Sequence, residues 1–173
     1  MGLLQPDNTN VLVPNRYVLS FIRLPNVQFF CQTVNLPGIN LSAVPRNTPF
    51  VDVSIPGDKL IYDPLTITFL VDEDLKAWRE IHDWMRGMTF PTKFEEYRDL
   101  AKQSPYVSQK SPQYSDATLV ILDSNQQGNY RFKFVDAFPT SLAAFTLSST
   151  LGPETIMTAD ATFSFTYFDL EKI

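Results

Sequence analysis

The chain has 173 residues, of which 44% are apolar and 13% aromatic, a length typical of one domain with its own core. Its 14 Lys and Arg residues stand against 19 Asp and Glu residues, and the formal net charge of −5 disfavours a protein that holds nucleic acid by neutralising phosphates. No apolar run approaches the roughly 20 residues that span a bilayer, so we expect no membrane anchor. A single cysteine, Cys31, and a single histidine, His82, exclude an intrachain disulfide and zinc sites built from several cysteines or paired histidines.

The N-terminal residues 1–14 differ from the rest of the chain and predict an arm, because Gln5–Asn10 form a polar cluster that cannot bury itself. Residues 15–173 are expected to form one domain. Apolar alternation predicts a strand over Tyr17–Ile22, followed by a turn and a returning strand over Val27–Val34.

A long, turn-rich excursion follows over Leu36–Asp63 and embeds one alternating strand, Val51–Ile55. Segments longer than about 12–15 residues without regular structure are often contact regions, so this excursion is the first predicted partner surface. An ordinary meander is the alternative. A period-2 strand is then predicted over Leu65–Val71.

An amphipathic helix is predicted over Glu73–Gly87, since its apolar residues recur three and four apart. The acidic residues 72–74 lie at its start, where they complement the positive end of the helix dipole. A shorter helix is predicted over Phe94–Lys102, and a polar connection over Gln103–Ser115.

The C-terminal third returns to β structure. Two alternating segments, Ala117–Ile121 and Tyr130–Phe134, predict a hairpin, and a further strand is predicted over Ser141–Ser148. The last predicted strand, Ala161–Phe168, is apolar on one face and uncharged but polar on the other. Seven or eight short strands with one amphipathic helix indicate a mainly β fold, a β-sandwich or barrel.

Residue types that carry catalysis are few and isolated. The six glycines lack the spacing of a phosphate-binding loop. His82 borders the apolar face of the predicted helix, which favours a packing role over a catalytic triad. Cys31 falls on an apolar strand face, as expected of a small core residue. We therefore expect no catalytic residue, no cofactor, no metal site and no enzyme activity.

The order of several motifs resembles the tail tube protein family of contractile-tailed bacteriophages. The resemblance covers most of the chain from about Arg16 onward. The motifs are a strand ending in Leu36-Pro37-Gly38-Ile39, a Gly-Asp turn within Ile55–Lys59, the threonine-rich strand 65–71, an acidic helix start with Asp83-Trp84 further on, and the corner Phe138-Pro139-Thr140.

This resemblance implies a β-sandwich protomer that closes into six-fold rings, stacked into a hollow tube through which DNA passes without specific binding. Such a protein is expected in the virion tail after assembly in the host cytoplasm, with sheath, baseplate and terminator proteins as partners. The acidic balance fits a negative lumen that repels DNA. The face of Thr162, Ser164 and Thr166 fits a channel wall or an edge-to-edge pairing surface.

Two surfaces follow from the same resemblance, and the N-terminal arm is expected to take part in stacking. The residues expected at ring-stacking contacts are Leu36, Pro37, Gly38, Ile39, Val51, Val53, Ile55, Gly57, Asp58 and Lys59. Those expected on the sheath-facing side of the helix are Lys76, Arg79, Glu80, Asp83 and Arg86.

Alternative functions remain open at this point. The chain could instead be a baseplate component that initiates the tube, or a tube protein of a contractile injection or secretion system. A different class is a monomeric β-sandwich that binds carbohydrate through Phe90, Phe94 and Tyr97. The tube functions predict self-association, whereas the binding module predicts a monomer.

Overall fold

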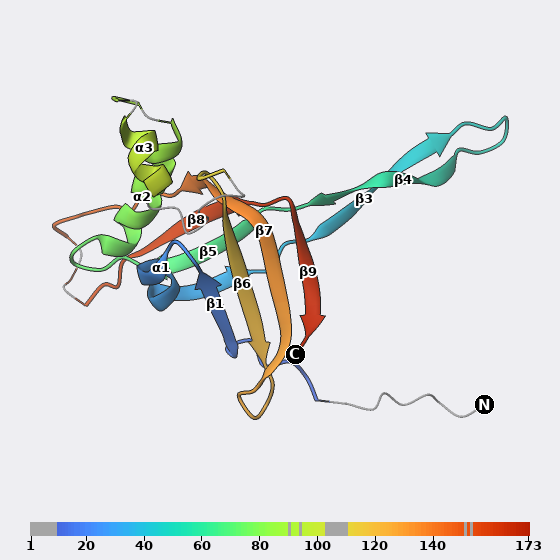
Figure 1. Cartoon of the computed structure of the whole chain (residues 1–173). Coiled ribbons are helices and arrows are strands. Elements are labelled where there is room, and N and C mark those ends of the chain that lie inside the picture. Colours follow the sequence, from blue (N-terminus) through green and yellow to red (C-terminus); the bar gives the residue numbers. More distant parts are fainter. Residues whose placement is uncertain (1–9, 90, 94, 103–110, 151, 153) are drawn as a thin grey trace.

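The computed structural model describes residues 10–89, 91–93, 95–102, 111–150, 152 and 154–173. These residues form nine strands and three helices, which make a β-rich body with one long hairpin projecting from it (Figure 1). In chain order the elements are β1 (Tyr17–Phe21), α1 (Pro25–Phe30), β2 (Cys31–Asn35), β3 (Ile39–Arg46), β4 (Val53–Tyr62), β5 (Leu65–Leu70), α2 (Lys76–Thr89), α3 (Glu95–Lys102), β6 (Ser115–Leu122), β7 (Gly128–Leu142), β8 (Thr158–Ser164) and β9 (Tyr167–Lys172).

The body has two antiparallel layers that share one strand. The first layer has the order β1-β6-β7-β9, and the second has the order β7-β8-β5-β2. The long strand β7 pairs with β9 through residues 130–135 and with β8 through residues 138–142. One continuous strand therefore passes from one layer into the other.

The change of layer occurs at Asp136, a non-glycine residue with φ 57°. The register between β6 and β7 shifts here, between Ser115 and Ala117, which is the signature of a β-bulge. The Asp136 N–H donates to Oδ1 of Asp116 at 3.3 Å, so a side chain of β6 holds the bulged backbone. This bulge gives β7 the bend that the two-layer arrangement requires.

The core fills the space between the two layers with aromatic side chains. Phe69, Phe134 and Phe163 are fully buried. The rings of Phe21 and Phe163, which come from different layers, have centroids 5.0 Å apart. Burying each such side chain contributes roughly 1.5–3 kcal/mol to folding, so these contacts are the main force that holds the layers together.

Helices α1, α2 and α3 stand together at one end of the layers (Figure 1). Helix α2 buries Ala77, Ile81 and Trp84, and the Trp84 indole N–H donates to the carbonyl of Gln113 at 3.0 Å. Among the described residues, no helix combines the length and apolar character needed to cross a membrane.

The predicted strand Val27–Val34 is wrong in its first half, which is the short helix α1 followed by β2. Pro25 occupies the start of α1, where its fixed φ suits a helix. The Glu80 carboxylate of α2 accepts hydrogen bonds from the backbone N–H groups of Asn26 at 3.1 Å and Val27 at 3.3 Å. A residue far along the chain therefore satisfies the free N–H groups at the start of α1. The local alternation of apolar residues does not reveal this contact.

Two further predictions in the C-terminal part are wrong. The predicted strand Ser141–Ser148 does not form, since β7 continues to Leu142 and residues 143–148 are irregular. The predicted last strand Ala161–Phe168 is divided between β8 and β9, with residues 165–166 connecting them. The chain turns there so that β9 can join the first layer. The predicted helices at 73–87 and 94–102 are confirmed as α2 and α3, with shifted ends.

The bulge at Asp136 gives a first prediction. Replacing Asp136 by Val should lower the free energy of unfolding by about 1–3 kcal/mol, because a β-branched residue is strained at positive φ. Asp136→Gly should cost less, since glycine adopts this conformation freely. Urea unfolding of both variants checks the order, and equal losses would show that the positive φ does not set the stability of the bulge.

The start of α2 gives a second prediction, which concerns pH. Asp72 accepts hydrogen bonds from the backbone N–H groups of Lys76 at 3.0 Å and Ala77 at 3.1 Å. Partial burial acts to raise the pKa of Asp72, but these N–H groups outweigh it and hold the pKa below its ordinary value of 3.8. The stabilisation is therefore present above that value and is lost as pH falls through the lower pKa of the folded state.

Asp72→Ala should accordingly cost about 1 kcal/mol of unfolding free energy at pH 7, as for other lost helix caps, and progressively less as the pH falls below 3.8. Urea unfolding of both proteins at pH 7 and at pH 3 measures the difference. A difference that does not change with pH would contradict a charged cap.

Candidate assembly surfaces

Cys31 and His82, the two residues considered as catalytic candidates, have surroundings that fit a role in packing. Burial of the Cys31 thiol raises its pKa to about 11, which keeps it protonated and weakly nucleophilic at neutral pH. His82 stacks on Trp78 with ring centroids 5.2 Å apart and lies 3.1 Å from the Asp83 carboxylate. Within the described ranges, no group of three or more His, Cys, Asp or Glu side chains is placed to hold a metal ion.

The residues proposed for carbohydrate binding are only partly visible. Phe90 and Phe94 lie outside the described residues, as do residues 1–9 of the predicted arm and residues 103–110 of the predicted connection. Tyr97 is half-buried on α3.

The hairpin of β3 and β4 extends away from both layers (Figure 1). Among the described residues these two strands pair only with each other, and a two-stranded sheet is marginally stable in water by itself. Val44 pairs with Ile55, and both are exposed. Exposed apolar side chains occur along the whole hairpin, namely Ile39, Leu41, Val44, Phe50, Val51, Val53, Ile55, Leu60 and Ile61. A surface of this kind is suited to burial against another molecule.

The residues predicted for ring stacking all lie on this hairpin or at its base. Leu36 and Gly38 are exposed next to the base, where the Asp63 N–H donates to the Gly38 carbonyl at 3.0 Å. Pro37 is buried and therefore belongs to the anchor of the hairpin. Ile39, Val53 and Ile55 are exposed strand residues, and Val51 is exposed at the hairpin tip. Their contact with a partner stays a prediction.

The expected Gly-Asp turn is wrong. Gly57 lies inside β4 with Asp58 and Lys59 after it, at the register shift opposite Ser42, and the hairpin tip is formed by residues 47–52. A Cβ atom on Gly57 would lie 2.5 Å from the Ser42 carbonyl oxygen, so this glycine permits a close approach of two backbones. Phe50, at the actual tip, is 99% exposed, which the sequence prediction missed.

The first layer ends in two free strand edges. Within the described residues, β1 pairs only with β6, and β9 pairs only with β7. Their outer backbone groups are therefore available for pairing with another chain. The edge of β9 was missed by the sequence analysis, although Phe168 and Leu170 alternate with Asp169 and Glu171 and so carry the signal of a strand.

The polar face of Thr162, Ser164 and Thr166 does not provide such an edge. Strand β8 pairs with β5 on one side and β7 on the other, and Thr162 lies opposite Thr66. Thr162 and Ser164 are half-buried, and Thr166 lies beyond the strand. The expectation that this strand supplies an edge is wrong, because β8 is paired on both sides. The alternative expectation, a channel wall, stays a prediction.

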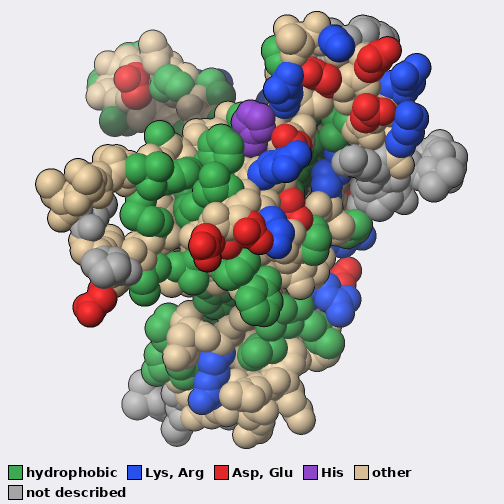
Figure 2. Space-filling view, turned by 90° about the vertical axis from the view of Figure 1, so that its left-hand side faces the viewer, with side chains coloured by type: hydrophobic (Ala, Val, Ile, Leu, Met, Phe, Trp, Pro, Cys, Tyr) green, Lys and Arg blue, Asp and Glu red, His purple; other side chains and the backbone are tan. Residues whose placement is uncertain are grey.

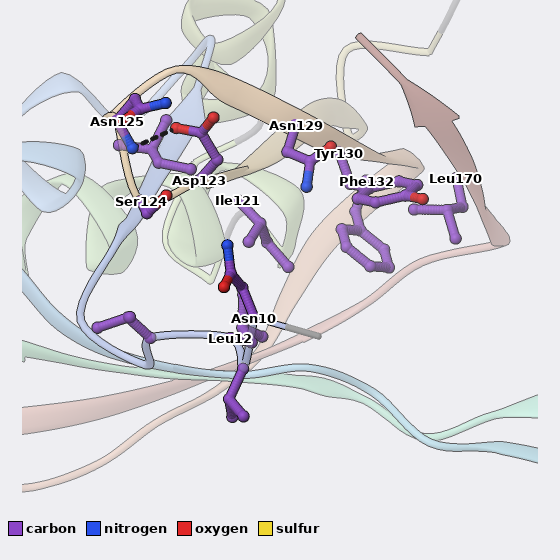
Figure 3. Close-up of a pocket in the computed structure, with 13 residues that line it drawn as sticks. Asn10, Leu12, Ile121, Asp123, Ser124, Asn125, Asn129, Tyr130, Phe132 and Leu170 are labelled. Carbon is purple, nitrogen blue, oxygen red and sulfur yellow. Dashed lines mark hydrogen bonds between the residues drawn. The ribbon is translucent and has the colours of Figure 1, made fainter. Parts of the chain in front are cut away.

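An open apolar groove of about 640 Å³ lies between residues 10–13 and the first layer. Figure 3 shows Asn10 and Leu12 on one side, Tyr130, Phe132 and Leu170 on the other, and Ile121 between them. Leu12 is 62% exposed and Leu170 56% exposed, so the apolar walls are incompletely covered. The groove adjoins the free edge of β9.

The predicted sheath-facing residues of α2 are mostly engaged within the chain. Arg79 pairs with Asp83 at 3.2 Å, and Arg86 pairs with Glu96 of α3 at 2.7 Å. Glu80 is turned to α1, and Lys76 pairs with Asp74 at 2.6 Å. Charges of both signs gather on the corner formed by α2 and α3 (Figure 2). Contact of these residues with a sheath stays a prediction.

Comparison with known proteins places these features in a family. The sequence profile described as "Phage tail tube protein" matches residues 9–171. The tail tube terminator protein of Enterobacteria phage T4 is 31% identical over 145 residues, which cover 82% of this chain and 76% of that protein.

Solved structures share the fold. The sheath/tube terminator of the extracellular contractile injection system PVC superposes with a TM-score of 0.60 at 14% identity, covering 95% of this chain and 99% of that chain. The tube terminating cap of the anti-feeding prophage superposes with a TM-score of 0.58 at 14% identity, covering 100% and 95%. At these identities the likeness concerns the fold alone.

Proposed function

Because this chain belongs to the phage tail tube protein family, we propose that it forms a closed ring that terminates the tail tube of a contractile-tailed phage. It is a structural tail component related to tail tube proteins. The observation that carries the finer proposal is the 31% identity to the T4 tail tube terminator. A ring that repeats along the tube is the second candidate, favoured by the resemblance of the motifs to tube proteins.

Ring closure uses the two free edges of the first layer. If β9 of one copy pairs with β1 of the next, the four strands of the first layer of each copy join a continuous barrel, and no edge of that layer remains unpaired. This contact is heterologous, so it closes into a ring when the rotation per copy divides the circle. A ring of six follows the family resemblance, and the structure of the anti-feeding prophage baseplate, which shares the fold, is described as 6-fold symmetrised.

The inner surface of such a barrel is the face of the first layer that points away from the second layer, which we call the bare face. The other face of this layer packs on the second layer, so the bulk of each protomer lies outside the barrel. Arg131 and Lys133 point away from the core between the buried Phe132 and Phe134, and therefore face the bore. DNA passes through this bore during ejection, in the virion tail that the ring helps to build.

The hairpin of β3 and β4 is the surface that contacts the last ring of the tube. Its apolar side chains are exposed on both faces, and it extends beyond the body that forms the ring wall (Figure 1). A terminator needs one such contact along the tube axis, whereas a tube-building ring needs two complementary ones. The sheath contacts the outer corner of α2 and α3. Assembly takes place in the host cytoplasm, and the ring needs no enzyme activity.

Negative-stain electron microscopy and light scattering over a concentration series test the proposal. A terminator should give single rings whose number of protomers does not change with concentration, because its second axial face is not complementary to the first. Tubes that lengthen with concentration would instead favour the tube-building function. A monomer at all concentrations would contradict ring closure through β1 and β9.

The hairpin can be tested on tubes purified from phage tails. Val44→Ser with Ile55→Ser removes a cross-strand apolar pair from one hairpin face and should reduce occupancy of tube ends at least tenfold, since each side chain contributes roughly 1.5–3 kcal/mol when buried. The matched control is Leu147→Ser with Ile156→Ser, which are 79% and 72% exposed outside the hairpin. Equal loss in both proteins, or no loss in the hairpin variant, would contradict the assignment.

A further inference from the structure

The bare face of the first layer carries a regular arrangement of charge. Side chains opposite one another across the strands form rows, because the strands are antiparallel and in register. The first row is Val18, Val120, Arg131 and Glu171, and the second row is Ser20, Thr118, Lys133 and Asp169.

Each row places one cation on β7 next to one acid on β9. Arg131 Nη1 lies 3.7 Å from Glu171 Oε2. Lys133 lies directly opposite Asp169 in the register, and both are exposed. On the β6 side the neighbours of these cations are Val120 and Thr118, so the acids of β9 supply the compensating charge within both rows.

This arrangement has a consequence for polyanions. Exposed Lys and Arg side chains on one surface bind phosphates by releasing counterions, and the affinity grows with the number of contacts. An acid beside each cation removes that gain. Exposed ion pairs contribute little to folding, so stability alone does not account for an acid opposite each cation here. In the proposed ring, each copy would otherwise bring two uncompensated cations to the bore.

We propose that Asp169 and Glu171 neutralise Lys133 and Arg131 and thereby prevent this sheet face from retaining double-stranded DNA. The inference rests on the proposed ring, in which the face lines the bore. The sequence-based expectation is a negative lumen that repels DNA. The inference instead gives a lumen whose cations are compensated, in which DNA meets alternating charge and slides.

The test compares binding of a labelled duplex DNA fragment to the full-length protein and to Asp169→Asn with Glu171→Gln. The variant should bind DNA at least tenfold more tightly at 50 mM salt, and its log affinity should fall more steeply with log salt, by about 2 for each protomer that contacts DNA. Circular dichroism and light scattering establish that the variant keeps the fold and the assembly state of the wild type.

The matched control is Asp74→Asn with Asp99→Asn. It also raises the net charge by two from −5 and also frees two exposed cations, Lys76 and Lys102, but on α2 and α3. It should bind DNA no better than the wild type. A gain equal to that of the β9 variant would show a net-charge effect and overturn the proposal.

A second variant identifies the cations that act. Adding Arg131→Gln and Lys133→Gln to the β9 variant should abolish the gained affinity, and a gain that persists would overturn the proposal. Either single variant, Asp169→Asn or Glu171→Gln, should show a smaller gain in DNA affinity and serves if the double variant does not fold.

The outcomes for this inference and for the proposed function can be told apart. If the wild type forms rings but the β9 variant gains no DNA affinity, only this inference is refuted. Absence of wild-type rings would refute the proposed function, and DNA affinity gained by the variant would still support charge compensation on this face.

Discussion

The bend of β7 at Asp136 is the constraint on which the other features of the body depend. A single strand passes from the first layer to the second only because its backbone adopts positive φ there and because Asp116 of β6 accepts the Asp136 N–H. The second half of β7 then pairs with β8, and its first half stays available for β9. The two layers enclose the aromatic core through this shared strand, and the first layer acquires β9 as its last edge.

Because β7 is shared between the two layers, the monomer leaves strand edges and an apolar hairpin uncovered. In the part of the chain that the structure describes, the edges of β1 and β9 keep unpaired backbone groups, and no second layer covers the apolar side chains of the β3–β4 hairpin. Unpaired edges and exposed apolar surface are costly for a free monomer and favourable for an assembly. The proposed ring uses the edges around its circumference and the hairpin along its axis, so lateral and axial contacts involve separate elements.

The charged side chains divide between two surfaces in a similar way. On the helical corner, Arg79, Arg86 and Lys102 each pair with an acid of α2 or α3. On the bare face of the first layer, the acids lie on a neighbouring strand, opposite the cations of β7. The proposed compensation there depends on strand register, since a slip of one residue would send the acids to the core face.

The sequence by itself determined the elements whose signal is local. Period-2 alternation identified β5 and β6, and three- and four-residue spacing identified α2. The length and turns of residues 36–63 favour a contact region, which stays a prediction. The tertiary structure alone decided the features that depend on residues far apart in the chain. Helix α1 replaces a predicted strand because Glu80 caps it, more than fifty residues away. Gly57 lies within β4 close to the Ser42 backbone, so the hairpin tip is formed by residues 47–52 instead, and the rows of charge exist because β9 returns to β7. Alternation assigns a side chain to a face, but only the pairing of distant strands decides which side chains share that face and which edges remain free.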